Sequence, residues 1–349
     1  MTQMSDEDSL LTAFGRGKRK VVRFSQEELV TTSCLNHGQR LPLVMQPNTN
    51  NLDLLAWAGD NRVYIEGALW KHGAILFRGF NLKSVTEFER FIRAVSGDAL
   101  AYNERSSPRS QISGHIYTST DYPADKQIFL HNEQSYNLLF PLKILFYCVN
   151  ASREGGATPI ADTRRVFDRI SGEVRERFLK RKYMYVRNFG DGFGLGWQEA
   201  FRTSSKSKVE EYCHSNQIEC EWRRGNRLRT KQVREVAARH PKTGEWVWFN
   251  HLTFFHSSTL DRQIQEEMMS AFAEENLPNN TYYGDGQRIE EEVMTHLREA
   301  YQKEKVRFDW QEGDILMLDN MLAAHGREAY AGDRSVAVGM VEACSWDRV

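Results

Sequence analysis

The stretch ILMLDNMLAAHGR, residues 315–327, decides the fold that we expect. Its apolar start, Ile315–Leu318, follows a Glu-Gly-Asp turn and predicts a strand, so His325 should lie at the edge of the core. A partner for this histidine is found in LHNEQ, residues 130–134, and the two histidines are 325 − 131 = 194 residues apart. Only a chain that returns on itself can join them. We therefore expect a β-core in which strands from both ends of the chain meet.

The segments around these stretches favour one decorated domain. Helical spacing of apolar residues predicts helices at 51–70, 84–97, 172–182, 206–216, 261–275 and 289–304. Runs of β-type residues predict strands at 74–80, 114–118, 127–131, 143–150, 158–161, 239–250, 306–310 and 334–343. We expect residues 1–50 to form an irregular N-terminal arm and residues 51–349 a single domain, with a helical insertion at about 172–305.

Composition excludes several classes of protein. The 349 residues are 40% hydrophobic and 11% aromatic, which excludes a disordered or low-complexity chain. A formal net charge of −1 offers no field to attract a nucleic acid or an anionic membrane. The five cysteines lack zinc-type spacing, and the chain has neither a secretory signal nor an apolar run of about 20 residues. We expect a cytoplasmic protein that binds neither nucleic acid nor membrane.

His131 and Glu133 are the first candidate metal ligands. They are two positions apart on a predicted strand, so both side chains point to the same face. An imidazole and a carboxylate placed this way can fill two neighbouring corners of a metal's coordination sphere, and a second histidine would complete a facial triad. His325 is the candidate for that third position. Taken singly, the alternatives are a polar strand face for the first pair and an ordinary loop histidine at 325.

Arg334 and Thr158 are candidates for holding a carboxylate. A buried carboxylate must be paired and hydrogen-bonded, because its desolvation is otherwise prohibitive. Arg334, at the start of a predicted strand shortly after His325, offers a planar fork of donors. Thr158, within GGATP at residues 155–159, offers a hydroxyl. A surface arginine and a turn threonine are the alternatives for each residue alone.

In order and spacing, these motifs resemble the taurine dioxygenase-like, or clavaminate synthase-like, family of Fe(II)/2-oxoglutarate oxygenases, from about Gly73 to the C-terminus. The motifs are His131-Asn132-Glu133, Gly155-Gly156-Ala157-Thr158 with Asp162, and Asp319-Asn320 with His325-Gly326-Arg327 and Arg334. The resemblance implies a mostly β fold with helices, in which a double-stranded β-helix, or jelly-roll, core carries helical insertions. It implies a catalytic Fe(II) site formed by His131, Glu133 and His325. Thr158 and Arg334 would bind the distal carboxylate of the co-substrate 2-oxoglutarate, and O2 would be the oxidant.

Two further stretches resemble a branch of this family that is often encoded beside peptide-antibiotic assembly lines. They are YNERSSP at 102–108 and HPKTGEWVWFN at 240–250. Known members of the branch hydroxylate amino acids, some of them tethered to a carrier protein. The resemblance implies a 2-oxoglutarate-dependent dioxygenase of secondary metabolism that releases succinate and CO2. Its substrate would be an amino-acid-like small molecule, either free or presented by a peptidyl carrier protein, and a homo-oligomer is compatible with this function.

Alternatives stay open at this point. Desaturation or ring closure can replace hydroxylation on the same scaffold, a His-Glu-His site also suits a zinc hydrolase, and a non-catalytic binding protein can keep the fold. Thr158 and Arg334 favour the oxygenase, because a hydrolase needs no dicarboxylate pocket. Glu133 argues against halogenation, which needs a small residue there, and Met340 stands near the place where taurine-using members have a second arginine. The candidates for substrate contacts are Arg105, Arg109 and Arg229, which could pair with an amino acid carboxylate or a carrier-arm phosphate, and Trp248 with Asn250, which could line the pocket. Ordinary surface or core positions are the alternative for each.

Overall fold

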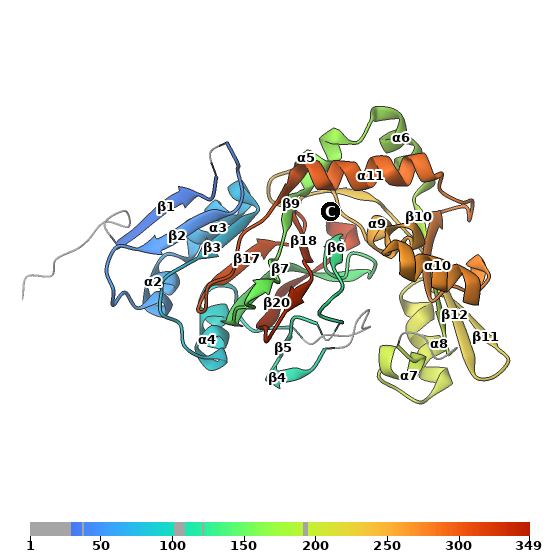
Figure 1. Ribbon diagram of the computed structural model, residues 1–349, viewed down its shortest axis with the longest axis horizontal. Coiled ribbons are helices and arrows are strands. Elements are labelled where there is room, and N and C mark those ends of the chain that lie inside the picture. The colour runs from blue at the N-terminus through green and yellow to red at the C-terminus, as the bar shows by residue number, and fades with distance from the viewer. Residues whose placement is uncertain (1–28, 37, 101–108, 121, 191–194) are drawn as a thin grey trace, which may run out of the picture.

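Two β-sheets form the centre of the molecule (Figure 1). The computed structural model describes residues 29–36, 38–100, 109–120, 122–190 and 195–349. The larger sheet has eight strands, in the order β1 (Val30–Cys34), β2 (Leu43–Pro47), β3 (Ala74–Phe77), β17 (Ile315–Asp319), β7 (Leu139–Asn150), β20 (Ser335–Ser345), β5 (Ile116–Thr118) and β4 (Gln111–Ser113). The smaller has four, in the order β16 (Lys305–Val306), β9 (Ile160–Asp162), β18 (Ala323–Arg327) and β6 (Ile128–His131).

The two sheets pack against each other through apolar side chains. One buried cluster combines Ile144 and Leu316 of the larger sheet with Ile160 and Ala323 of the smaller one. The alternate residues of β17, Ile315 and Met317, belong instead to a cluster on the other face of the larger sheet. That face is covered by α2 (Leu54–Asp60), α3 (Arg62–His72) and α4 (Val85–Ser96). Because β17 is buried on both faces, its first four residues, Ile315–Leu318, are an uninterrupted apolar run.

A long insertion separates β9 from β16. It contains α5 (Thr163–Arg169), α6 (Gly172–Arg181), β10 (Tyr183–Phe189), α7 (Trp197–Ala200), α8 (Lys206–Ser215), β11 (Glu219–Arg223), β12 (Arg227–Arg234), β13 (Ala237–Arg239), β14 (Trp246–Trp248), α9 (Leu252–Phe255), η1 (Ser257–Thr259), α10 (Arg262–Ala271), η2 (Glu274–Asn276), β15 (Asn279–Tyr283) and α11 (Glu291–Glu304). The expectation of a helical insertion therefore holds only in part, because β11, β12, β10 and β15 form a sheet of their own. Short strands β8 (Glu154–Gly155) and β19 (Tyr330–Ala331) pair beside the core, and η3 (Trp346–Arg348) follows β20.

The N-terminal region differs from the expectation of an irregular arm. Residues 1–28 lie outside the described part, but β1 and β2 are strands of the larger sheet, and β2 runs parallel to β3. Leu43, Val44 and Met45 of β2 are buried, and this burial stabilises the strand. At the other end of the insertion, the strand expected at 306–310 is confined to Lys305–Val306. Among the described residues, no helix has the length and apolar character needed to span a membrane.

Candidate metal centre

Backbone pairing brings the two candidate histidines together. Strand β18 runs antiparallel to β6, and His325 lies directly opposite His131 in the ladder. Their ring centroids are 4.5 Å apart. The sequence predicted His325 at the edge of the core, after the strand at 315–318, with an ordinary loop histidine as the alternative. The structure places it in the middle of β18, all of whose residues are buried. The expectation that the chain returns on itself is confirmed by this pairing.

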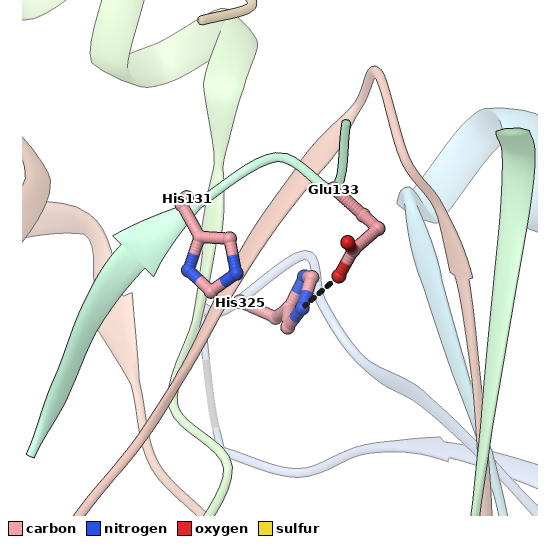
Figure 2. A group of neighbouring side chains, drawn as sticks. All are labelled: His131, Glu133 and His325. Atoms are coloured by element: carbon pink, nitrogen blue, oxygen red, sulfur yellow. Dashed lines mark ion pairs between the residues drawn. The ribbon is translucent and has the colours of Figure 1, made fainter. Parts of the chain in front are cut away.

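Glu133 reaches the same place from outside a strand. β6 ends at His131, so the prediction that both residues share one strand is wrong for Glu133. Its Oε2 nevertheless lies 4.0 Å from Nε2 of His325 (Figure 2). One ligand atom from each of His131, Glu133 and His325 lies within 4.8 Å of the others. The exposed fractions of the three residues are 9%, 2% and 5%, so the cluster is shielded from bulk water.

Both imidazoles are held in the neutral form that binds metals. Nδ1 of His131 is 2.9 Å from the carbonyl oxygen of Phe129 and must donate to it, so its Nε2 keeps a free lone pair. Burial is the main cause that lowers the pKa of His131, although Glu133 acts in the opposite direction. Burial, followed by the neighbouring His131, lowers the pKa of His325 well below its ordinary value.

The donor set fits a ferrous ion. Two neutral imidazoles and one carboxylate on one side of an ion leave its other positions open, which is the arrangement of non-haem iron oxygenases. Nδ1 of His325 is buried and has no hydrogen-bond partner in the described part of the chain. No described protein group therefore occupies this ring nitrogen. The three residues can therefore hold an ion that keeps positions for further ligands.

Arg109 contacts the carboxylate of this cluster. Its Nη2 donates to Oε2 of Glu133 at 2.6 Å, and both side chains are buried. The sequence proposed Arg109 as a partner for a substrate carboxylate; in the structure it bonds a carboxylate of the chain itself. Its charge also contributes to lowering the pKa of both His131 and His325. Arg105, proposed for the same role, lies outside the described residues.

Thr158 and Arg334 come together as predicted. Nη2 of Arg334 lies 3.4 Å from Oγ1 of Thr158, and Nε of Arg334 donates to the carbonyl of Gly156 at 2.9 Å. Oγ1 of Thr158 also accepts from Nε1 of Trp310 at 3.0 Å. Since the threonine oxygen accepts two hydrogen bonds, its own hydroxyl hydrogen is available for a further acceptor.

The charge of Arg334 is not neutralised by the described part of the protein. No acidic side chain there lies within ion-pair distance of it. Burial, followed by the charge of Arg327, lowers the pKa of Arg334 to about 10, so the guanidinium stays charged at neutral pH. A buried charge needs a counter-ion. A guanidinium beside a free hydroxyl donor fits a carboxylate ligand.

The carboxylate site lies next to the metal cluster. In the ladder between β18 and β9, His325 is opposite Ile160. The backbone N–H of Gly326 donates to the carbonyl of Pro159 at 2.9 Å, directly after Thr158. Thr158 is thus two residues from the position that pairs with His325, so the candidate carboxylate site and the candidate metal ligands lie on the same strand pair.

The remaining residues predicted to contact substrate are buried or bonded to other parts of the chain, and their role toward a substrate stays a prediction. Arg229 donates to the side chains of Asn188 and Asn276 in the sheet of the insertion. Trp248 is fully buried, and the amide of Asn250 bonds the backbone of Val236 and Leu252.

Sequence reasoning missed His251. Its ring centroid lies 5.3 Å from that of His131, and its Nδ1 lies 2.7 Å from the hydroxyl of Ser135. Phe254 stacks on His131 with centroids 4.6 Å apart. The only signal for these residues is that they directly follow the stretch at 240–250.

Comparisons with known proteins find a matching family model, similar sequences and a similar fold. Residues 39–340 match the model of the family described as "Taurine catabolism dioxygenase TauD, TfdA family". The dapdiamide synthesis protein DdaC of Enterobacter agglomerans is 40% identical over 234 residues, which cover 67% of this chain and 71% of DdaC. A clavaminate synthase-like protein of Arabidopsis thaliana is 27% identical over 242 residues, covering 66% and 73%. The crystal structure of PvcB from Pseudomonas aeruginosa is similar in fold, with a TM-score of 0.54 at 16% identity over 92% of this chain and 94% of PvcB.

Proposed function

Because this chain belongs to the TauD, TfdA family, and is thus a 2-oxoglutarate-dependent dioxygenase that uses Fe(II), we propose that it hydroxylates an unactivated C–H bond of an amino acid or an amino-acid-derived molecule. The observation that carries the proposal is the position of Arg334 and Thr158 beside the cluster of His131, Glu133 and His325. A zinc hydrolase would have no use for a second site that fits a dicarboxylate. A non-catalytic protein would not need both sites intact.

The proposed roles follow the chemistry of each side chain. His131, Glu133 and His325 would hold Fe(II), and Thr158 with Arg334 would bind the distal carboxylate of 2-oxoglutarate. When bound, the iron and the oxo acid supply the oxidation: O2 is consumed, 2-oxoglutarate becomes succinate and CO2, and one oxygen atom enters the substrate C–H bond.

The surrounding residues orient these groups and keep water away. Phe254 stacks on the ring of His131, and the ring centroid of Phe146 lies 5.1 Å from that of His325. The bond from Arg334 to the Gly156 carbonyl fixes the guanidinium before any co-substrate arrives. Such preorganisation lowers the cost of binding the distal carboxylate of the co-substrate.

We further propose that the two packed sheets are a double-stranded β-helix and that residues 51–349, together with β1 and β2, form one domain around it. The support is that the last strands of the chain pair with strands from its first half in both sheets. β18 lies between β9 and β6, and β20 lies between β7 and β5. The insertion leaves this core after β9 and re-enters it at β16.

A biosynthetic role is supported by the relative DdaC, whose name assigns it to dapdiamide synthesis. We propose an antibiotic-type secondary metabolite pathway and a substrate presented either free or on a peptidyl carrier protein. Glu133 supports hydroxylation over halogenation because the carboxylate ligand is present.

Mass spectrometry of a panel of free and carrier-bound amino acids tests the proposal. The purified protein is incubated with Fe(II), 2-oxoglutarate and O2, with omission of 2-oxoglutarate as the control. A gain of one oxygen in one substrate, with matching release of succinate, is the expected result. Loss of two hydrogens would identify a desaturase instead. No succinate release with any member of the panel would contradict the oxygenase assignment for these substrates, and equal rates for free and tethered forms would contradict carrier presentation.

A further inference from the structure

Asn320 is fully buried in the turn between β17 and β18, the strand that carries His325. It lies directly after β17, three residues before β18, and its exposed fraction is 0%. Its Oδ1 accepts from the backbone N–H of Glu133 at 2.8 Å. Its Nδ2 donates to the carbonyl oxygens of Glu133 at 2.9 Å and Pro141 at 2.8 Å. One side chain thus bonds both backbone polar groups of the candidate carboxylate ligand.

These bonds replace a strand partner. Because β6 ends at His131, Glu133 has no ladder neighbour to fix its backbone. In an antiparallel pair, two facing residues bond each other through both the N–H and the C=O group. Here the side-chain amide of Asn320 takes the place of the facing residue and bonds both the N–H and the C=O of Glu133. The side chain of Asn132 adds a bond to the carbonyl of Asn320 at 2.6 Å. The segment that holds Glu133 is therefore attached to the segment that carries His325.

Asn320 is itself held in a rigid turn. Oδ1 of the preceding residue, Asp319, accepts from the backbone N–H groups of Met321 and Leu322, both at 3.0 Å. Oδ2 of Asp319 lies 3.0 Å from Nε2 of His240, which is also buried. Since Nδ1 of His240 accepts from the N–H of Thr243, the hydrogen of this ring lies on Nε2 and is donated to Asp319.

We propose that Asn320 is a positioning residue for the metal centre: by fixing the backbone of Glu133 it sets the distance between the Glu133 carboxylate and His325, and thereby the affinity for a divalent metal ion. The inference rests on the proposed ligand role of Glu133. It makes Asn320 necessary for metal binding without contact between Asn320 and the metal. Groups that orient metal ligands typically change metal affinity by about 10- to 100-fold when they are replaced.

Co(II) binding measures this effect without turnover, because the visible absorption of bound Co(II) reports both affinity and coordination geometry. Asn320→Ala removes all three side-chain bonds. Asn320→Asp keeps the size and the acceptor, but a carboxylate cannot donate to the two carbonyls. Both variants should bind Co(II) about 10- to 100-fold more weakly than the unsubstituted protein.

Asn188→Ala is the matched control. The amide nitrogen of Asn188 also donates to two backbone carbonyls, of Glu275 at 3.1 Å and Leu277 at 2.7 Å, and its Oδ1 accepts from Arg229 at 2.8 Å. It lies in the sheet of the insertion, on β10. This variant should lower the melting temperature while leaving Co(II) affinity within about twofold, since no bond to a ligand is lost.

Three results would overturn the inference. One is Co(II) affinity within twofold of the unsubstituted protein in a folded Asn320→Asp variant; another is an equal loss of affinity in Asn188→Ala. If neither Asn320 variant folds, hydrogen exchange of the unsubstituted protein decides, because the Glu133 amide should exchange slowly although it lies outside a strand, and rapid exchange would refute the bond. Glu133→Ala separates the two proposals: if it keeps full Co(II) affinity, the ligand role of Glu133 itself is wrong.

Discussion

Replacing Arg334 with leucine should weaken 2-oxoglutarate binding while leaving the metal cluster in place. In the structure Nε of Arg334 donates to the carbonyl of Gly156. Nη1 also contacts Ser119 and Nη2 contacts Thr158, but each Nη carries two hydrogens, so one on each remains to meet a carboxylate. Hydrogen bonds to a charged group contribute about 1.5–3 kcal/mol each, and a total loss of about 3 kcal/mol corresponds to roughly 100-fold in affinity. We expect the KM for 2-oxoglutarate to rise by about that factor.

Two readouts together separate binding from folding. Succinate formation as a function of 2-oxoglutarate concentration gives the KM, and Co(II) affinity reports the metal cluster. Burial lowers the pKa of Arg334, which means that the charged guanidinium destabilises the ligand-free protein. The leucine variant should therefore lose no folding free energy through a missing ion pair. Thermal unfolding without 2-oxoglutarate checks this point.

Arg229→Leu is the control for that experiment. Arg229 is another arginine whose pKa is lowered mainly by burial, but its partners lie in the sheet of the insertion. It should leave the 2-oxoglutarate requirement unchanged. A KM for 2-oxoglutarate within twofold of the unsubstituted value in Arg334→Leu, or an equal rise in Arg229→Leu, would remove Arg334 from the proposed co-substrate site.

Three other perturbations follow from the same structure. Glu133→Ala should abolish Fe(II)-dependent turnover and lower bound iron; turnover with normal iron content, measured by plasma mass spectrometry, would contradict the ligand role. Thr158→Val should raise the KM for 2-oxoglutarate by about 3- to 10-fold through loss of one hydroxyl donor, whereas Thr158→Ser should change it little. Burial lowers the pKa of His256 to about 4, below its unfolded value near 6.5, so its contribution to stability is complete above pH 6.5 and is lost as the pH falls toward 4. Urea unfolding measures the free energy of unfolding at pH 7 and at pH 4.5. The decrease between these two pH values should be about 2–3 kcal/mol smaller in His256→Gln than in the unsubstituted protein. An equal decrease in both proteins would show that His256 does not titrate this way.

The central strands of the larger sheet were predictable because their burial leaves a direct trace in the sequence, whereas β1, β2 and β4 were not predicted. β17 is apolar at every position from Ile315 to Leu318, and β7 and β20 show similar runs. β18 was not predicted, since Ala323, Ala324 and Gly326 carry little β-propensity. This strand forms because β6 and β9 pair with it on either side, which no local pattern reveals.

The sheet of the insertion was missed for a related reason. Every second residue of β12 is buried, which is the period of a strand, but three of those residues are Thr230, Gln232 and Arg234. A search for alternating apolar residues does not detect buried polar ones. Arg109 shows a similar limit: its charge predicted a carboxylate partner, but only the fold shows that Glu133 supplies one.

Pairing of β6 with β18 also sets the order of events during synthesis. A growing chain on the ribosome exposes His131 and Glu133 long before His325, which emerges 194 residues later. Until then the nascent protein has only two of the three proposed ligands. The complete three-residue site can form only after residue 325 has been synthesised, and a product truncated before that residue would lack one proposed ligand.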